Sequence, residues 1–153
     1  MATRSTIALE FADGTIGQVY CHSDGYLSYN GNILMTHYTD PFKVQQLIDN
    51  GDLSLLGVDI GGVIDFNAPM EYTDNEKAVQ CRFYGRDRAE SGIDATYFTN
   101  FQDYKDNHTE QEYEYILRND GNWYVKQYRG DYELLVDAYV EYLRELHFEE
   151  STD

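Results

Sequence analysis

Five carboxylates recur at every fourth position near the C-terminal end of the chain: Glu133, Asp137, Glu141, Glu145 and Glu149. On an α-helix this spacing places successive acids about 6 Å apart along the axis. Like charges at that spacing repel one another and destabilise an isolated helix. A row of negative charges can also imitate a phosphate backbone, whose charges lie about 3.4 Å apart along each strand. The row therefore predicts a surface that binds a basic partner, and a solvated helix face is the alternative.

A second acidic group precedes this row and contains Asp103, Asp106 and Glu110, followed by Glu112 and Glu114. It would extend the negative surface if it folds near the C-terminal helix. A charged loop and strand edge is the alternative interpretation. Asp103, Asp106 and Glu110 are included among the predicted partner-binding residues.

Residues that could catalyse a reaction or hold a metal form no recognisable set. Cys21 and His22 are adjacent, and neighbouring residues on a strand point to opposite faces, so they should not meet as nucleophile and base. The four histidines are dispersed without metal-ligand spacing. Arg86 and Arg88 are interpreted as internal ion-pair partners, with an anion site as the alternative. We therefore predict a protein that is not an enzyme and that uses no metal and no cofactor.

Charge is the strongest compositional signal, since 28 acidic side chains oppose 11 basic ones and the net charge is −17. Direct binding to nucleic acid or to an anionic membrane requires positive charge and is not expected. A cationic partner is favoured, whereas solubility or salt adaptation would explain the same composition without a partner. The absence of a signal-like or membrane-spanning segment predicts a cytoplasmic protein. Cys21 and Cys81 are then expected to be reduced and buried.

Alternating apolar residues and Asp-Gly dipeptides predict two β-hairpins. A two-residue turn is expected in each, at Asp13-Gly14 and at Asp120-Gly121. In the second hairpin this register would set Ile116 opposite Val125 and Tyr115 opposite Lys126. The predicted strands are residues 5–11 with 15–22 and residues 111–118 with 123–129.

Helices are predicted over residues 32–38, over residues 41–50 with Asp40 as the cap, and over residues 131–148. A strand over 78–85 lies between two loops at 67–77 and 86–94. The fold class is α+β: an antiparallel sheet of hairpins with helices packed on one face and a long C-terminal helix. Residues 1–153 form a single domain with an acidic tail at 149–153. The predicted core face of the last helix is Leu135, Ala138, Tyr139, Tyr142 and Leu146.

The N-terminal segment Ala8-Leu-Glu-Phe-Ala-Asp-Gly-Thr15, continued by Gln18-Val-Tyr-Cys-His22 and Asp24-Gly-Tyr26, resembles a hairpin found in small proteins encoded by bacteriophages and prophages. Asn50-Gly-Asp-Leu-Ser-Leu-Leu-Gly57 and Gly85-Arg-Asp-Arg88 are similar to later parts of that pattern, so the resemblance covers roughly the first 90 residues. The resemblance implies a phage protein acting inside a bacterial cell, and it transfers no catalytic residues. Small acidic phage proteins often inhibit host machinery, including restriction enzymes and CRISPR complexes.

These features together predict an acidic phage-encoded inhibitor that binds a basic nucleic-acid-binding surface of a host defence protein, with DNA-mimic-like anti-CRISPR or anti-restriction action. Carboxylates would replace phosphates against Lys and Arg, and Tyr side chains would supply contact area. The predicted partner is a host nuclease or CRISPR complex with a basic groove, and a homodimer is left open. The alternative is an intracellular module that binds a small ligand, such as a nucleotide signal, in a pocket beside the sheet.

Overall fold

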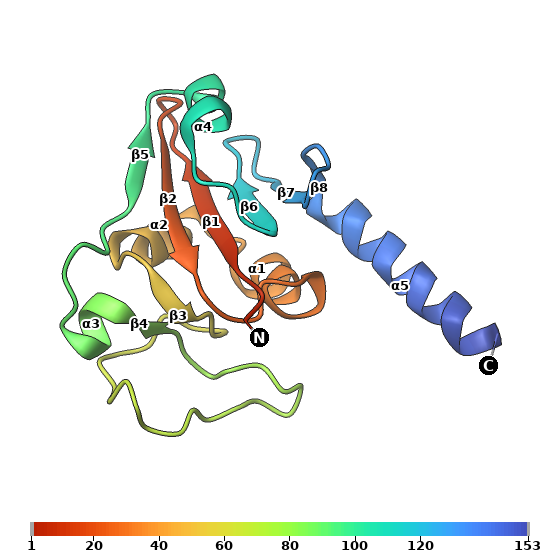
Figure 1. Cartoon of the computed structure of the whole chain (residues 1–153), viewed down its shortest axis with the longest axis horizontal. Coiled ribbons are helices and arrows are strands. Elements are labelled where there is room, and N and C mark those ends of the chain that lie inside the picture. The colour runs from red at the N-terminus through yellow and green to blue at the C-terminus, as the bar shows by residue number, and fades with distance from the viewer. Residues whose placement is uncertain (1, 153) are drawn as a thin grey trace.

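The computed structural model describes residues 2–152, with side chains described as far as residue 148. A mostly antiparallel sheet and several helices confirm the α+β class (Figure 1). The helices are η1 (Leu27–Gly31, a π-helical turn), α1 (Asn32–His37), α2 (Pro41–Asp49), α3 (Tyr84–Arg88), α4 (Phe101–Asn107) and α5 (Leu135–Thr152). The strands are β1 (Ser5–Glu10), β2 (Ile16–Cys21), β3 (Leu53–Leu55), β4 (Arg82–Phe83), β5 (Thr96–Phe98), β6 (Tyr113–Leu117), β7 (Trp123–Gln127) and β8 (Glu133–Leu134).

The sheet is built from the two predicted hairpins laid side by side. Its strand order is β4-β3-β2-β1-β6-β7-β8, and β5 pairs with β2 as well. The β1–β2 and β6–β7 pairs are antiparallel, which confirms both hairpins. The hairpins join through a parallel pairing of β1 with β6, in which Ser5 is opposite Tyr113 and Leu9 is opposite Leu117. The centre of the sheet is therefore made of one hairpin from the first third of the chain and one from the last third.

The predicted two-residue turns are wrong, and the register of the second hairpin differs by one residue. Gly121 has φ +85° and donates its N–H to the carbonyl oxygen of Arg118 at 3.0 Å. Arg118 in turn donates its N–H to the carbonyl oxygen of Asn122 at 3.0 Å. This is a type I turn followed by a glycine bulge, which adds one residue to the connection. Leu117 consequently lies opposite Trp123.

The first hairpin has the same turn. Gly14 has φ +90° and donates to the carbonyl oxygen of Phe11 at 2.9 Å. The carboxylate of Asp13 accepts the N–H of Thr15 at 3.0 Å, which stabilises the turn locally. Asp-Gly thus marked both turns correctly but not their length.

Two hydrophobic clusters cover the two faces of the sheet. The larger is formed with α1, α2 and α5 on one face, whereas α4 packs on the other, so the prediction that the helices share one face holds for these three and not for α4. The smaller lies on the opposite face, where Tyr104 from α4 is fully buried against the sheet. The smaller cluster contains Ala8, Ile16, Phe98, Tyr104 and Ile116.

The C-terminal helix begins at Leu135 rather than at residue 131, because residues 133 and 134 pair with β7 as β8. Leu135 and Ala138 are buried, as predicted. Leu146, predicted for the core, is 40% exposed, because α5 extends away from the sheet (Figure 1). The backbone of the predicted tail continues α5 to Thr152, while residue 153 lies outside the described residues.

The middle of the chain departs most from the predicted elements. The strand predicted over 78–85 shortens to β4, because residues 84–88 turn into α3. The side chain of Asp87 accepts the N–H of Phe83 at 2.8 Å and so fixes the entry to that helix. Residues 95–110, which carry no clear periodicity, form β5 and α4. The predicted start of α2 is confirmed, since Asp40 accepts the N–H of Phe42 at 2.9 Å.

Candidate protein-binding groove

A groove of about 530 Å³ runs between α5, η1 and the end of the β6–β7 hairpin. Three of the predicted carboxylates line it, from Glu133, Glu141 and Glu145. Three tyrosines share the groove with these acids, from segments that are far apart in the sequence. The full lining is Tyr26, Leu27, Ser28, Tyr113, Gln127, Glu133, Ala138, Glu141, Tyr142 and Glu145.

Contacts with neighbouring residues fix the positions of the groove tyrosines. Tyr113 stacks on Tyr115 with ring centroids 6.3 Å apart and planes 9° apart. The buried Tyr115 hydroxyl donates to the carbonyl oxygen of Gly25 at 2.6 Å, which fixes the segment that carries Tyr26. Tyr142 packs against the main core from α5. Rigid aromatic rings of this kind give contact area at little entropic cost on binding.

The groove is negatively charged. Among its described lining residues there is no Lys, Arg or His. Arg144 is on α5, but its guanidinium lies 3.9 Å from Glu141, and both side chains are largely exposed, so this ion pair is weak. Burial, together with the charge of Asp24, raises the pKa of Tyr26, whose hydroxyl donates to Asp24 Oδ1 at 3.2 Å and keeps its oxygen free to accept. The groove therefore offers carboxylates and hydroxyls to a cationic group.

The other predicted site residues are not in the groove. Asp137 is exposed on α5 but does not line it. Glu133 contributes from β8, so the prediction that it belongs to the helical row is wrong. Glu149 lies in the α5 backbone, but its side chain is outside the described residues.

The second acidic group is not brought onto the same surface. Asp103 and Asp106 are on α4, which packs on the opposite face of the sheet from α5. Both serve local structure: Asp103 accepts the N–H of Thr99 at 2.8 Å, and Asp106 accepts a side-chain N–H of Gln102 at 2.9 Å. Glu110 lines a separate hollow that also contains Lys126, Tyr128 and Arg129.

A buried ionic network was not predicted from the sequence. The Glu114 carboxylate is 0% exposed and accepts hydrogen bonds from His108 Nε2 and, at 2.8 Å, from the Tyr132 hydroxyl. Lys126 Nζ lies 3.7 Å from its second oxygen. His108 Nδ1 is 2.5 Å from the carbonyl oxygen of Tyr104. The carbonyl oxygen can only accept, so Nδ1 carries a proton, and with Glu114 ionised Nε2 donates as well and the imidazole is charged.

The pKa shifts agree with this charged pair. Burial alone would lower the pKa of His108, but the hydrogen bond and charge of Glu114 outweigh it and raise that pKa. Burial likewise opposes ionisation of Glu114, yet hydrogen bonds from His108 and Tyr132 hold its pKa below the ordinary range. The network joins α4 to the β6–β7 hairpin in the interior, and neither His108 nor Glu114 lines the groove beside α5.

We expect folding stability to fall as pH rises through the folded pKa of His108. A raised pKa gives stabilisation that is complete below the unfolded value of about 6.5 and is lost above the folded value. Urea unfolding between pH 6 and 9 should show this decline, and His108→Gln should flatten it. His37→Gln, at an exposed histidine, is the matched control. Equal slopes for wild type and His108→Gln would contradict a charged imidazole in the folded state.

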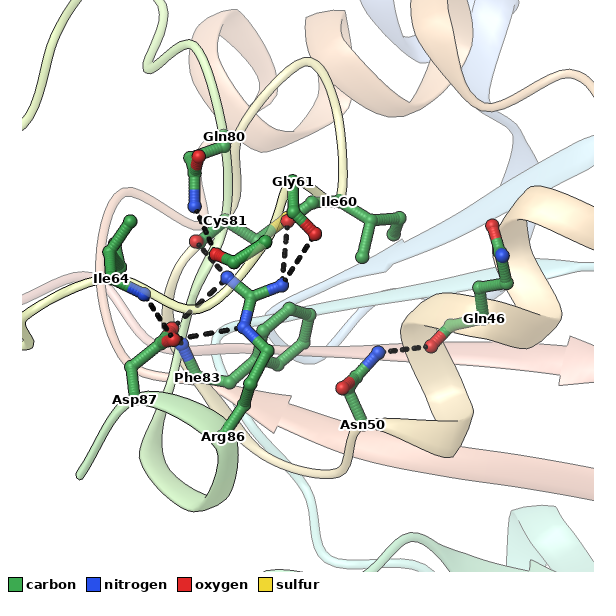
Figure 2. Close-up of polar contacts among 11 residues, drawn as sticks. Gln46, Asn50, Ile60, Gly61, Ile64, Gln80, Cys81, Phe83, Arg86 and Asp87 are labelled. Atoms are coloured by element: carbon green, nitrogen blue, oxygen red, sulfur yellow. Dashed lines mark hydrogen bonds and ion pairs between the residues drawn. The ribbon is translucent and has the colours of Figure 1, made fainter. Parts of the chain in front are cut away.

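Arg86 forms an internal ion pair with Asp87, as predicted (Figure 2). Its guanidinium binds Asp87 at 2.9 Å and donates to the carbonyl oxygens of Ile60, Gly61 and Cys81 at 2.8–3.1 Å. These bonds leave little donor capacity for an anion. Arg88 pairs with Glu90, which confirms the second predicted internal ion pair.

Cys21 and Cys81 are free and 0% exposed, as expected, and burial raises the pKa of Cys21 to about 12. The neighbour of Cys21, His22, instead contacts the Tyr20 hydroxyl at 2.7 Å. In the described part of the chain, His, Cys, Asp and Glu form no group of three or more that could hold a metal ion. No helix within the described residues is long and apolar enough to cross a membrane.

Comparison with protein-family models, with curated proteins and with solved structures finds no match to this chain.

Proposed function

We propose that the protein is an acidic, phage-encoded inhibitor acting in the bacterial cytoplasm. It binds a basic nucleic-acid-binding surface of a host defence protein, such as a CRISPR complex or a restriction nuclease. The observation that carries this proposal is the groove in which Glu133, Glu141 and Glu145 converge with three tyrosines. Carboxylates there take the place of phosphates against Lys and Arg, and the hydroxyls add hydrogen bonds.

The charge of the whole molecule supports the same role. A net charge of −17 attracts a basic partner over distances longer than any contact and raises the association rate at low salt. Tyr and Arg are the residues that most often dominate protein interfaces. The groove supplies the tyrosines, and a nucleic-acid-binding surface on the partner would supply the arginines.

The alternative, a nucleotide-binding module, receives less support from the cavities. A nucleotide phosphate in the groove would meet carboxylates and no cation among the lining residues. A second hollow of about 600 Å³ beside α2 contains Lys43. Its ammonium is already engaged by the carbonyl oxygens of His37 and Val58 and by Asp59. Both sites repel an anionic ligand.

We expect the combined variant Glu133→Gln, Glu141→Gln and Glu145→Gln to bind its partner about tenfold more weakly, since three exposed charge pairs contribute roughly 0.2–1 kcal/mol each. The measurement uses purified CRISPR effectors and restriction nucleases, with inhibition of DNA cleavage and partner affinity read at two salt concentrations. Wild-type affinity should fall steeply with salt, and DNA should compete. Folding stability should not decrease, because the removed charges repel one another.

The matched control removes three exposed acids that do not line the groove, with Glu71→Gln, Asp74→Asn and Glu76→Gln. It has the same net charge as the groove variant, so it separates local contacts from general electrostatics. Equal affinity of the two variants would show that the groove is not the binding site. Absence of inhibition of any nuclease tested, together with no competition by DNA, would overturn the proposed function.

A further inference from the structure

The outward side of α5 carries an apolar seam that is distinct from the side packed on the core. Val136, Val140 and Leu143 are 51%, 41% and 46% exposed, and His147 continues their line. Their spacing of four, three and four residues is the seven-residue repeat of helices that pair with another helix. Leu135 and Ala138, on the other side, are buried in the domain itself. The helix is therefore apolar on two sides, and the domain covers one of them.

We propose that this seam binds a second copy of the chain, with the two α5 helices packed antiparallel. A seam that pairs with itself must present matching residues when it is reversed. Reversal about a point between residues 141 and 142 sets Val140 opposite the second copy's Leu143, and Val136 opposite the second copy's His147. The same layers recur on the other half of the pair, as twofold symmetry requires.

The charges beside the seam favour this arrangement. Asp137 and Arg144 follow the seam residues along one edge, seven residues apart, so they cannot meet within one helix. In this register each Arg144 lies two residues, about 3 Å along the axis, from being level with the second copy's Asp137. The long Arg144 side chain spans that offset, so the dimer contains two Asp137–Arg144 ion pairs. The other edge carries Leu146, which is 40% exposed, while Tyr139 beside it is partly buried against the domain core.

Antiparallel pairing also separates the acidic bodies. Each copy carries a net charge of −17, and its folded body lies at the N-terminal end of α5 (Figure 1). A parallel pair would hold the two bodies side by side and would stack His147 on His147. The antiparallel pair places the bodies at opposite ends of the helices, where their repulsion is weaker and screened.

A hollow at the base of α5 provides room for the incoming helix end. It measures about 180 Å³ and is lined by Met35, Trp123, Leu135 and Val136, among others. Val136 is the residue that the reversed register sets against the C-terminal part of the second copy. The seam thus ends on a cavity in the body rather than on a closed surface.

This inference is independent of the proposed function. Glu141 and Glu145 lie on the groove side of α5, about 100–180° around the helix from the seam residues at 100° per residue. The dimer leaves the groove of each copy open. Loss of dimerisation and loss of partner binding are therefore separable results.

Sedimentation velocity over a concentration series tests the proposal with the full chain. Wild type should convert from 17.8 kDa monomer to a dimer as concentration rises. Val140→Lys with Leu143→Lys should weaken dimerisation at least about tenfold. The matched control, Phe42→Lys with Val63→Lys, changes apolar residues that are 78% and 75% exposed elsewhere and should dimerise like wild type. Wild type that remains monomeric at about 100 µM would overturn the proposal.

A charge exchange tests the antiparallel register. Asp137→Arg alone and Arg144→Asp alone each set like charges against one another across the dimer and should weaken it. The combined variant Asp137→Arg with Arg144→Asp restores opposite charges between copies and should recover dimerisation. Each variant is first shown by circular dichroism to be folded. Failure of the combined variant to recover, while wild type dimerises, would reject this register.

Discussion

Replacing Glu114 with Ala is expected to lower the free energy of unfolding by about 3–5 kcal/mol, the range for breaking a buried ion pair by removing one partner. The carboxylate is completely buried and is the common acceptor for His108, Tyr132 and Lys126. Its removal leaves the imidazolium of His108, which is 3% exposed, without a counter-charge. Urea unfolding at pH 6, where His108 is charged, measures the loss.

Two controls separate the charge from the shape of this side chain. Glu114→Gln keeps the volume and an oxygen that can accept the Tyr132 hydroxyl, so it should be less destabilising than Glu114→Ala. Glu112→Ala removes an exposed acid two residues away and should change stability by no more than about 0.5 kcal/mol. A Glu114→Ala variant as stable as Glu112→Ala would show that the network contributes nothing to folding.

Local patterns predicted the elements but not their alignment. Alternation of apolar residues is a property of single strands, so both hairpins could be recognised from the sequence. The register depends on whether Gly121 lies inside a two-residue turn or follows a type I turn with φ > 0. Asp-Gly is compatible with both, and a shift of one residue changes which side chains face each other. Leu117 opposite Trp123 could not be read from the sequence.

The candidate site shows the same limit on a larger scale. The acids of α5 were found because their spacing is periodic along one segment. Tyr26 and Tyr113 join them only because the parallel β1–β6 pairing brings distant segments together. Glu133 left the helical row because pairing with β7 overrode the local helical pattern. Glu114 was read as a surface acid, since acids are rarely buried unless they are paired, and its partner His108 was not an evident one.

Tyr38 connects three parts of the fold and has no exposed surface. Its hydroxyl donates to the carbonyl oxygen of Gly57 at 2.8 Å, in the connection that follows β3. Its own carbonyl oxygen accepts the indole N–H of Trp123 at 2.9 Å, on β7. The Lys43 ammonium lies 4.3 Å from the centre of its ring. The residue therefore links the α1–α2 connection to both ends of the sheet.

Replacing Tyr38 with Ala is expected to lower the free energy of unfolding by about 3–5 kcal/mol, the range for large aromatic residues removed from a core. The loss has two parts: the buried ring no longer contributes its transfer free energy, and a cavity remains in its place. Tyr38→Phe keeps the ring and should cost only about 1–3 kcal/mol, from the buried Gly57 carbonyl left without its donor. Tyr128→Ala, at a tyrosine that is 69% exposed, should stay within about 0.5 kcal/mol of wild type. Urea unfolding of the three variants at one pH gives the ranking. If Tyr38→Phe destabilised the protein as much as Tyr38→Ala, the hydroxyl rather than ring packing would be the dominant contribution, and the cavity argument would be wrong.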